Sequence, residues 1–190
     1  MDKNPTRQLY DDPDNPYHPS DGRPGADVFP YVMTTYRLTE HHTAGGMSRT
    51  LEHLSELQPE MFVEVSPELA VQRGLEHAGW ATVVTARTAI EARVMITDRL
   101  VPLTVDGVTV HQVGLPYHWG RRGLSRGDAA NELLPLALDL NTHIAEYKAA
   151  TCDIRPGRRP RGAALRQLIG EYRRRAAVLQ EDRHASRGDR

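Results

Sequence analysis

Short runs of apolar and β-branched residues dominate the middle of the chain, and most have the length of a β-strand. Residues 80–86 (WATVVTA) and 89–97 (AIEARVMIT) are separated only by Arg87 and Thr88, which predicts a β-hairpin. In the second arm, apolar side chains share one face, at Ile90, Ala92, Val94 and Ile96. This period of two predicts a strand with one face in a core.

The same reasoning predicts a second hairpin and three further strands. Residues 101–105 and 108–113 flank Asp106–Gly107, a strong signal for a tight turn. Further strands are expected at 28–35, where Pro30 interrupts the run, at 62–66 and at 148–155.

Three segments have helical character. Residues 47–57 place Met47, Leu51, Leu54 and Leu57 at helical spacing. Ser66 followed by Pro67 predicts a capped helix start, and Gly74 predicts its early end. Residues 162–180 repeat apolar positions along one helix face, at Leu165, Leu168, Ile169, Tyr172, Ala176 and Leu179.

Many short strands with few helices predict a mainly β fold with α insertions, either a barrel or a sandwich. The 190 residues suit one domain with appendages. Residues 1–27 carry five prolines among polar residues, so we expect an extended Pro/Asp-rich lead-in. Residues 28–155 would then form the folded domain, and residues 156–190 an Arg-rich helical tail.

Charge is divided unevenly along the chain. Residues 155–190 hold eleven arginines against four acidic residues, a net charge of +7, whereas the remaining residues carry −8. Such a tail could meet nucleic acid, anionic lipid or an acidic partner surface. A solvated extension is the plainer interpretation of the same composition.

Several classes of protein are excluded. No apolar run reaches the length of a membrane span, and residues 1–30 contain no signal-peptide core. We therefore expect a cytoplasmic location, or a periplasmic or membrane-associated one if the chain is exported with a signal-bearing partner.

Cys152 is the only cysteine, so this chain forms no internal disulfide, cysteine zinc cage or iron–sulfur site. We expect Cys152 to be a buried structural thiol.

A glycine-containing loop follows the first predicted strand. Its backbone amides between Thr43 and Gly46 could meet a phosphate, and Arg37 could pair with the same group. A purely structural turn explains these residues equally well. Metal binding at His41 and His42 is disfavoured because neither has a helical partner or a nearby carboxylate at ligand spacing.

The loop at 115–120 (LPYHWG) is the second unusual cluster. Aromatic and histidine side chains between glycines can stack on a planar heterocycle. A hydrophobic plug at one barrel end would have the same composition. Asn131 and Lys148 could add an amide and a point charge to one ligand, although each alone is typical of a cap or a surface.

These clusters occur together in a known family. From about Val28 to Arg155 the chain resembles the C-terminal molybdopterin-dinucleotide-binding domain of the dimethyl-sulfoxide-reductase family of molybdenum and tungsten enzymes. More narrowly, it is similar to the end of the major (alpha) subunit of respiratory formate dehydrogenases. The phrases that carry the resemblance are FPYVMTTYRLTEHHTAGGMSR (29–49), LQPEMFVEVSPELA (57–70), TDRLVPLTVDGVTVHQVGLPYHWG (97–120) and DAANELLP (128–135). The lead-in NPTRQLYDDPDNPY (4–17) resembles the segment that precedes this domain.

The resemblance implies a six-stranded double-psi β-barrel that covers one of two molybdopterin guanine dinucleotides on molybdenum or tungsten. It implies contacts to this cofactor from the residues that match the family's motifs: Thr35, Tyr36, Arg37, Leu38, His41, Thr43, His118, Trp119, Gly120, Asn131 and Lys148. Tyr36 stands where the family usually has glycine. No catalytic residue or metal ligand is implied in this chain.

The implied function is the cofactor-binding part of an enzyme that oxidises formate to carbon dioxide. The iron–sulfur cluster, the metal ligand and the catalytic residues would lie in the remaining large subunit, which makes that polypeptide the expected partner. We expect the lone chain to be inactive and to have no transmembrane segment. Two alternatives remain: a stand-alone molybdopterin-binding or accessory module without turnover, and a scaffold barrel whose Arg-rich tail binds nucleic acid.

Overall fold

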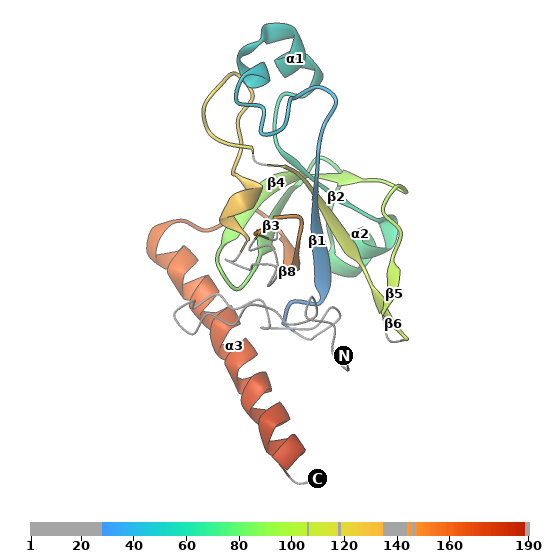
Figure 1. Ribbon diagram of the computed structural model, residues 1–190, viewed down its shortest axis with the longest axis vertical. Helices are drawn as coiled ribbons and strands as arrows, with labels where there is room; N and C mark the ends of the chain where they lie inside the picture. Colours follow the sequence, from blue (N-terminus) through green and yellow to red (C-terminus); the bar gives the residue numbers. More distant parts are fainter. Residues whose placement is uncertain (1–27, 106, 118, 135–143, 146, 189–190) are drawn as a thin grey trace.

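Six strands close into a barrel with mixed strand directions in the computed structural model, which describes residues 28–105, 107–117, 119–134, 144–145 and 147–188 (Figure 1). The strands are β1 (Tyr31–Tyr36), β2 (Phe62–Val65), β3 (Trp80–Val84), β4 (Ala89–Ile96), β7 (Gln112–Pro116) and β8 (Ala149–Pro156). Around the barrel their order is β1-β7-β2-β4-β3-β8. The pairs β1–β7 and β2–β4 are parallel, and β8 closes the ring antiparallel to β1 and β3. The predicted mainly β fold, a six-stranded double-psi barrel, is confirmed.

The barrel interior is filled by the alternating apolar positions of the strands. Val63, Val83 and Val113 are fully buried, as are Met33 and Ile154. Burying a side chain of this size stabilises the fold by roughly 1.5–3 kcal/mol. The alternation visible in the sequence therefore sets which face of each strand points inward.

Both predicted hairpins form. The β3–β4 turn is closed by the Thr85 amide, which donates to the Thr88 carbonyl at 2.9 Å. β5 (Leu103–Val105) and β6 (Val108–Val110) make a separate two-stranded sheet outside the barrel. The chain then continues into β7. The predicted strand at 108–113 is therefore divided between the two-stranded sheet, which holds β6, and the barrel, which holds β7.

The helix at Ser66 is also confirmed. α2 spans Pro67–Arg73, the Ser66 hydroxyl accepts from the Leu69 amide at 3.2 Å, and Gly74 ends the helix with φ of +64°.

The single helix predicted over 47–57 is wrong. Leu51 is extended (φ −90°, ψ 126°) and divides the segment into a 3₁₀ turn at Ser48–Thr50 and the short helix α1 (Glu52–Leu57). The Thr50 hydroxyl donates to the Met47 carbonyl at 2.7 Å, a local bond that competes with a continuous helix. Three of the four apolar side chains of the predicted stripe, Met47, Leu51 and Leu57, are exposed.

The long C-terminal helix α3 (Gly162–Gly188) starts where the sequence predicts and packs on the barrel along its first half (Figure 1). Leu168, Ile169, Tyr172 and Ala176 form a second apolar cluster with Val28, Phe29, Val84 and Ala89. The Tyr172 ring stacks on Phe29 with centroids 5.7 Å apart, and its hydroxyl donates to Asp153 at 2.5 Å. The expectation of a solvated extension is therefore wrong for this part of the tail.

Arginines that precede α3 pair with carboxylates of the barrel. Arg158 and Arg161 each donate to Glu91 at 2.7 Å, and Arg159 lies 3.0 Å from Asp128. The basic tail thus neutralises buried acids of the acidic barrel. In the part of the chain that the structure describes, no helix has the length and apolar character needed to cross a membrane. The predicted lead-in (1–27) lies outside the described residues.

Candidate functional site

The parallel pairing of β1 and β7 brings two predicted loops to one edge of the barrel. Tyr36 is in register with Pro116, and the Tyr117 amide donates to the Tyr36 carbonyl at 2.8 Å. The Thr35 amide donates to the Lys148 carbonyl at 2.9 Å. Residues 35–38, the loop after Pro116 and the start of β8 therefore lie together, because parallel strands end at the same edge of a sheet.

Arg37 stacks its guanidinium over the Tyr117 ring, 3.5 Å from the ring centroid. Its backbone neighbour Tyr36 continues β1 as an ordinary strand residue, with no positive φ. The tyrosine at the position of the family's glycine therefore needs no special backbone conformation.

The Tyr36 ring is accommodated by a glycine on the neighbouring strand. A Cβ atom added at Gly114 would lie 2.8 Å from Cε1 of Tyr36, so a side chain there would collide with the ring. The Tyr36 hydroxyl is buried and has no hydrogen-bond partner among the described residues. Burial raises the pKa of this hydroxyl, so it remains protonated and able to donate.

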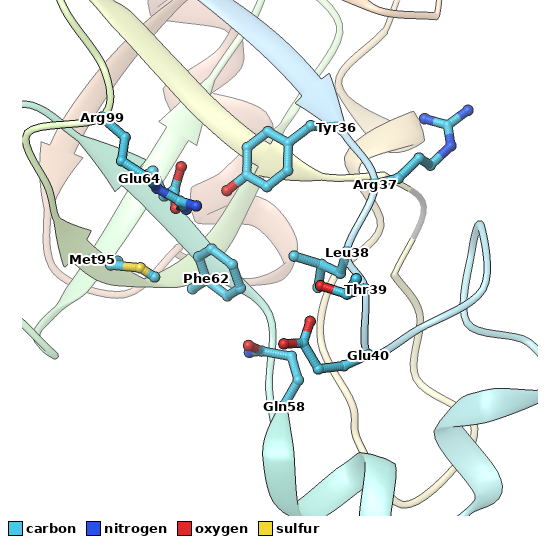
Figure 2. Close-up of a pocket in the computed structure, with 10 residues that line it drawn as sticks. All are labelled: Tyr36, Arg37, Leu38, Thr39, Glu40, Gln58, Phe62, Glu64, Met95 and Arg99. Atoms are coloured by element: carbon cyan, nitrogen blue, oxygen red, sulfur yellow. Dashed lines mark hydrogen bonds and ion pairs between the residues drawn. The ribbon is translucent and has the colours of Figure 1, made fainter.

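A pocket of about 420 Å³ opens beside this edge (Figure 2). Its walls come from the β1 end and from neighbouring strands and loops: Tyr36, Arg37, Leu38, Thr39, Glu40, Gln58, Phe62, Glu64, Met95 and Arg99. In the view of Figure 2 the Tyr36 ring lies between Arg37 and the ion pair of Glu64 with Arg99. The pocket thus combines aromatic surface with cations and carboxylates, a lining that suits a polar heterocycle.

His41 is a structural residue of the adjoining loop. Its side chain is 1% exposed, and both ring nitrogens are bonded within the protein. Nε2 faces the Gln58 carbonyl at 3.0 Å and must donate, so Nδ1 accepts from the Ser48 hydroxyl at 3.1 Å. The ring contacts Trp119 edge-on, with centroids 5.0 Å apart. His41 therefore holds Trp119 rather than offering a free nitrogen to a ligand.

Arg49 links the loop that follows β1 to the loop that follows β7 by hydrogen bonds. Its guanidinium donates to the carbonyls of Ala44 (3.3 Å), Gly120 (3.2 Å) and Ser125 (3.0 Å), and also to that of Arg122. Burial lowers the pKa of Arg49 from its usual value.

Two glycines make this close approach possible. A Cβ at Gly45 would lie 2.7 Å from the Arg49 side chain, and one at Gly123 would lie 2.8 Å from its carbonyl. Both glycines have positive φ, +68° and +106°. No motif or spacing in the sequence distinguishes Arg49 from the other arginines, of which the chain has twenty-two in all.

Of the remaining predicted residues, Thr43 and Trp119 lie on the two loops described above, and Asn131 lies beside the β3–β4 turn. Trp119 is buried and its Nε1 has no partner within the described residues. Thr43 is exposed on its loop with φ of +47°. Asn131 lies in a 3₁₀ turn (Ala130–Glu132), where its carbonyl accepts from Arg87 of the β3–β4 turn at 3.1 Å. His118 lies outside the described residues.

Three of the predicted site residues carry buried polar atoms that nothing described in the protein satisfies: the Tyr36 hydroxyl, Trp119 Nε1 and Asn131 Oδ1. A buried polar atom without a partner costs about 1–3 kcal/mol, so such atoms indicate where a ligand can bond. Two are donors and one is an acceptor, and Arg37 adds a positive charge. Tyr36 and Arg37 line the pocket, whereas Trp119 and Asn131 are not among its lining residues. A phenol hydroxyl beside a guanidinium fits a polar ligand that carries a phosphate. No three His, Cys, Asp or Glu side chains of the described ranges converge on a metal position.

Comparisons with curated proteins give a consistent result. The Molydopterin dinucleotide binding domain family model matches residues 31–151. The chain is 37% identical over 159 residues to formate dehydrogenase 2 subunit alpha (cytochrome c-553) of Nitratidesulfovibrio vulgaris, covering 82% of this chain and 16% of the relative. It is 44% identical over 129 residues to the nitrate-inducible formate dehydrogenase major subunit of Escherichia coli, covering 67% and 12%. The chain thus spans less than a fifth of the length of these relatives.

The solved structure of acetylene hydratase from Pelobacter acetylenicus is similar in fold, with a TM-score of 0.55 at 12% sequence identity, over 68% of this chain and 18% of that one. At this identity the likeness concerns the fold alone. Together with the match over residues 31–151, which covers the whole edge where β1 and β7 end, it agrees with the geometry described above. The chain belongs to the molybdopterin dinucleotide-binding domain family, with the alpha subunits of formate dehydrogenases among its relatives.

Proposed function

We propose that this chain is the C-terminal cofactor-binding part of a formate dehydrogenase large subunit and that it clamps one molybdopterin guanine dinucleotide. The observation that carries the proposal is the set of buried, unpartnered polar atoms on Tyr36, Trp119 and Asn131. Trp119 and Asn131 match the family's motif residues, and Tyr36 stands at a motif position where the family usually has glycine. A nucleotide would supply the missing partners.

The residues have distinct roles in this proposal. The chain at Thr35–Leu38 wraps the dinucleotide at the end of β1 through amides beyond that of Thr35, which donates to the Lys148 carbonyl. Arg37 and Lys148 neutralise the pyrophosphate. Lys148 is exposed beside Thr35, where its ammonium can reach a phosphate. Trp119 and Asn131 bond the heterocyclic parts, as would His118. Gly120 and Thr43 let the backbone approach the cofactor, while His41 fixes the Trp119 ring.

The cofactor, when bound, supplies the molybdenum or tungsten centre at which formate loses two electrons and a proton to give carbon dioxide. This chain contributes binding and orientation. The iron–sulfur cluster and the catalytic residues belong to the rest of the large subunit, since the chain spans only 12–17% of its formate dehydrogenase relatives. We infer that these 190 residues alone have no turnover.

The proposal is tested by co-expressing this chain with the polypeptide that carries the rest of the large subunit and purifying through this chain. We expect the two to elute together with molybdenum or tungsten and with formate–viologen activity. Arg37→Ala and Asn131→Ala should each lower the bound metal and the activity at least fivefold. Arg166→Ala, on the exposed face of α3, is the matched control.

Two results would reject the proposal. A complex with full metal content in both variants would remove these residues from the cofactor site. Cofactor bound by the chain alone, at the level of the complex, would favour the stand-alone binding module.

A further inference from the structure

The segment that leads from β8 into α3 carries three arginines, and one of them is buried. The Arg159 side chain is 8% exposed, against 59% for Arg158 and 55% for Arg161. The two exposed arginines pair with Glu91 on β4. Nη2 of Arg159 instead lies 3.0 Å from Oδ2 of Asp128 and 3.2 Å from Oδ1. Arg159 therefore makes a buried, charge-assisted contact that neither neighbour makes.

Asp128 belongs to the loop after β7 that also carries Trp119 and Gly120. The adjoining Gly127 amide donates to the Gly120 carbonyl at 2.9 Å, which closes this loop. A Cβ atom at Gly127 would lie 2.8 Å from Cδ1 of the Trp119 ring, so the backbone passes directly against the ring. Arg121 of the same loop donates to Asp128 at 2.9 Å. The carboxylate that the buried guanidinium holds is therefore next to the bond that closes the loop.

A second arginine, on α3 itself, supports the segment that carries Asn131. Arg173 donates from Nε to the Ala86 carbonyl at 2.8 Å and from Nη2 to the Arg87 carbonyl at 3.0 Å, both in the β3–β4 turn. The Arg87 side chain in turn donates to the Asn131 carbonyl at 3.1 Å and to the Leu134 carbonyl at 2.5 Å. α3 is thus connected through this turn to a second predicted cofactor residue.

α3 is fixed to the barrel independently of these arginines. Leu168, Ile169 and Tyr172 are buried against the barrel, and the Tyr172 hydroxyl donates to Asp153 on β8. The family model matches residues up to 151, so α3 and the arginines before it lie outside the matched region. Their contacts with the two cofactor segments are therefore not implied by the family match.

We propose that Arg159 and Arg173 are positioning residues for the dinucleotide site. Arg159 holds the loop that carries Trp119, through Asp128. Arg173 holds the turn that carries Asn131. Neither arginine lines the pocket, so both act through the segments that they hold. Segments that are fixed before the ligand binds lose less conformational entropy on binding, so the dinucleotide is retained more tightly. This inference rests on the proposed function.

The test uses the complex of this chain with the polypeptide that carries the rest of the large subunit. Arg159→Met keeps an unbranched side chain but removes the bond to Asp128, and Arg159→Lys keeps the charge. The matched control is Arg161→Gln in the same segment, because Glu91 keeps its other arginine there. Two quantities are measured: the rate of hydrogen exchange at the Gly127 amide and the amount of guanine nucleotide retained after dialysis.

We expect the Gly127 amide of Arg159→Met to exchange about tenfold faster than in the wild type. The Val94 amide, which donates to the Gly79 carbonyl at 2.9 Å, should exchange within about twofold of the wild type, because the effect is local. The variant should retain about threefold less guanine nucleotide. Arg159→Lys should recover about half of the lost nucleotide, and Arg161→Gln should match the wild type.

Arg173→Gln tests the second connection and decides the matter if Arg159→Met does not fold. It should retain about twofold less nucleotide and speed exchange at the Leu133 amide, which donates to the Ala130 carbonyl in the turn of Asn131. Wild-type exchange at Leu133 with full nucleotide in this variant would overturn the role of Arg173.

Three other results would overturn the inference. Unchanged Gly127 exchange and full nucleotide in Arg159→Met would do so and leave the proposed function intact. Equal acceleration at Gly127 and Val94, with full nucleotide, would give Arg159 a purely structural role. A wild-type complex without guanine nucleotide would reject the proposed function, and the inference would fall with it.

Discussion

The guanidinium of Arg49 should be the strongest single point of attachment between the two loops at the candidate site. Arg49→Met keeps an unbranched apolar side chain in the same space but removes four donations to carbonyl groups. One of these bonds, to the Ser125 carbonyl, is buried and should contribute about 2 kcal/mol. The three part-buried bonds should contribute about 0.5 kcal/mol each, because water replaces the lost donor. The expected loss in the free energy of unfolding is about 3–4 kcal/mol.

Urea unfolding followed by circular dichroism measures this loss. For a chain of this length it corresponds to a fall of about 10 °C in the thermal midpoint. Hydrogen exchange adds a local readout, since the amides of Leu124 and Gly127 donate to Arg49 and Gly120 and should lose protection first. Arg122→Met is the control, because that side chain is exposed and only its backbone carbonyl takes part. A loss below 1 kcal/mol with unchanged exchange at both amides would refute the role of Arg49.

Three further predictions concern single side chains. Burial disfavours the charged form of Glu91, but the hydrogen bond from Arg158 and the charges of Arg161 and Arg158 outweigh it and hold its pKa below the usual 4.5. Stability from this carboxylate is therefore present above about pH 4.5 and lost as the pH falls through the folded value. Glu91→Gln should lower the free energy of unfolding by about 1–3 kcal/mol at pH 7. It should also reduce the loss of stability that urea unfolding records as the pH is lowered below about 4.5. The same loss in the variant and the wild type would contradict this. Tyr36→Phe should leave the lone chain as stable or up to about 1 kcal/mol more stable in urea, because the lost hydroxyl has no described partner; a loss above 1 kcal/mol would reveal one. Cys152 is fully buried and burial raises its pKa, so a thiol reagent at pH 8 should label it only after denaturation; rapid labelling of the native chain would disprove this.

Local signals in the sequence predicted the elements that depend on nearby residues. The β3–β4 hairpin and the start of α2 at Ser66 are fixed by turn and capping chemistry within a few positions, and both formed as expected. The helix over 47–57 failed for a local and a tertiary reason. The Thr50 hydroxyl bonds to the Met47 carbonyl, and Arg49 is held by carbonyls of the loop at 120–125, which lies far away in the sequence.

At the candidate site, too, the sequence predicted which residues matter in part, but their contacts depend on the fold. Motif resemblance selected Tyr36, Trp119 and Asn131, which the structure finds with unpartnered buried atoms. It also selected His41, whose two ring nitrogens prove to be occupied within the protein. The charge asymmetry was visible in composition, but the pairing of Arg158 and Arg161 with Glu91 required the fold.

The guanine nucleotide content of the purified complex tests the central claim most directly. Acid treatment of the complex between this chain and the rest of the large subunit releases the nucleotide half of the cofactor, which chromatography then quantifies. We predict a stoichiometric amount in the wild-type complex and at least a fivefold lower amount in the Arg37→Ala and Asn131→Ala complexes, with the Arg166→Ala control unchanged. Equal nucleotide in all four complexes, with the two chains still bound, would contradict the claim that this barrel clamps the dinucleotide.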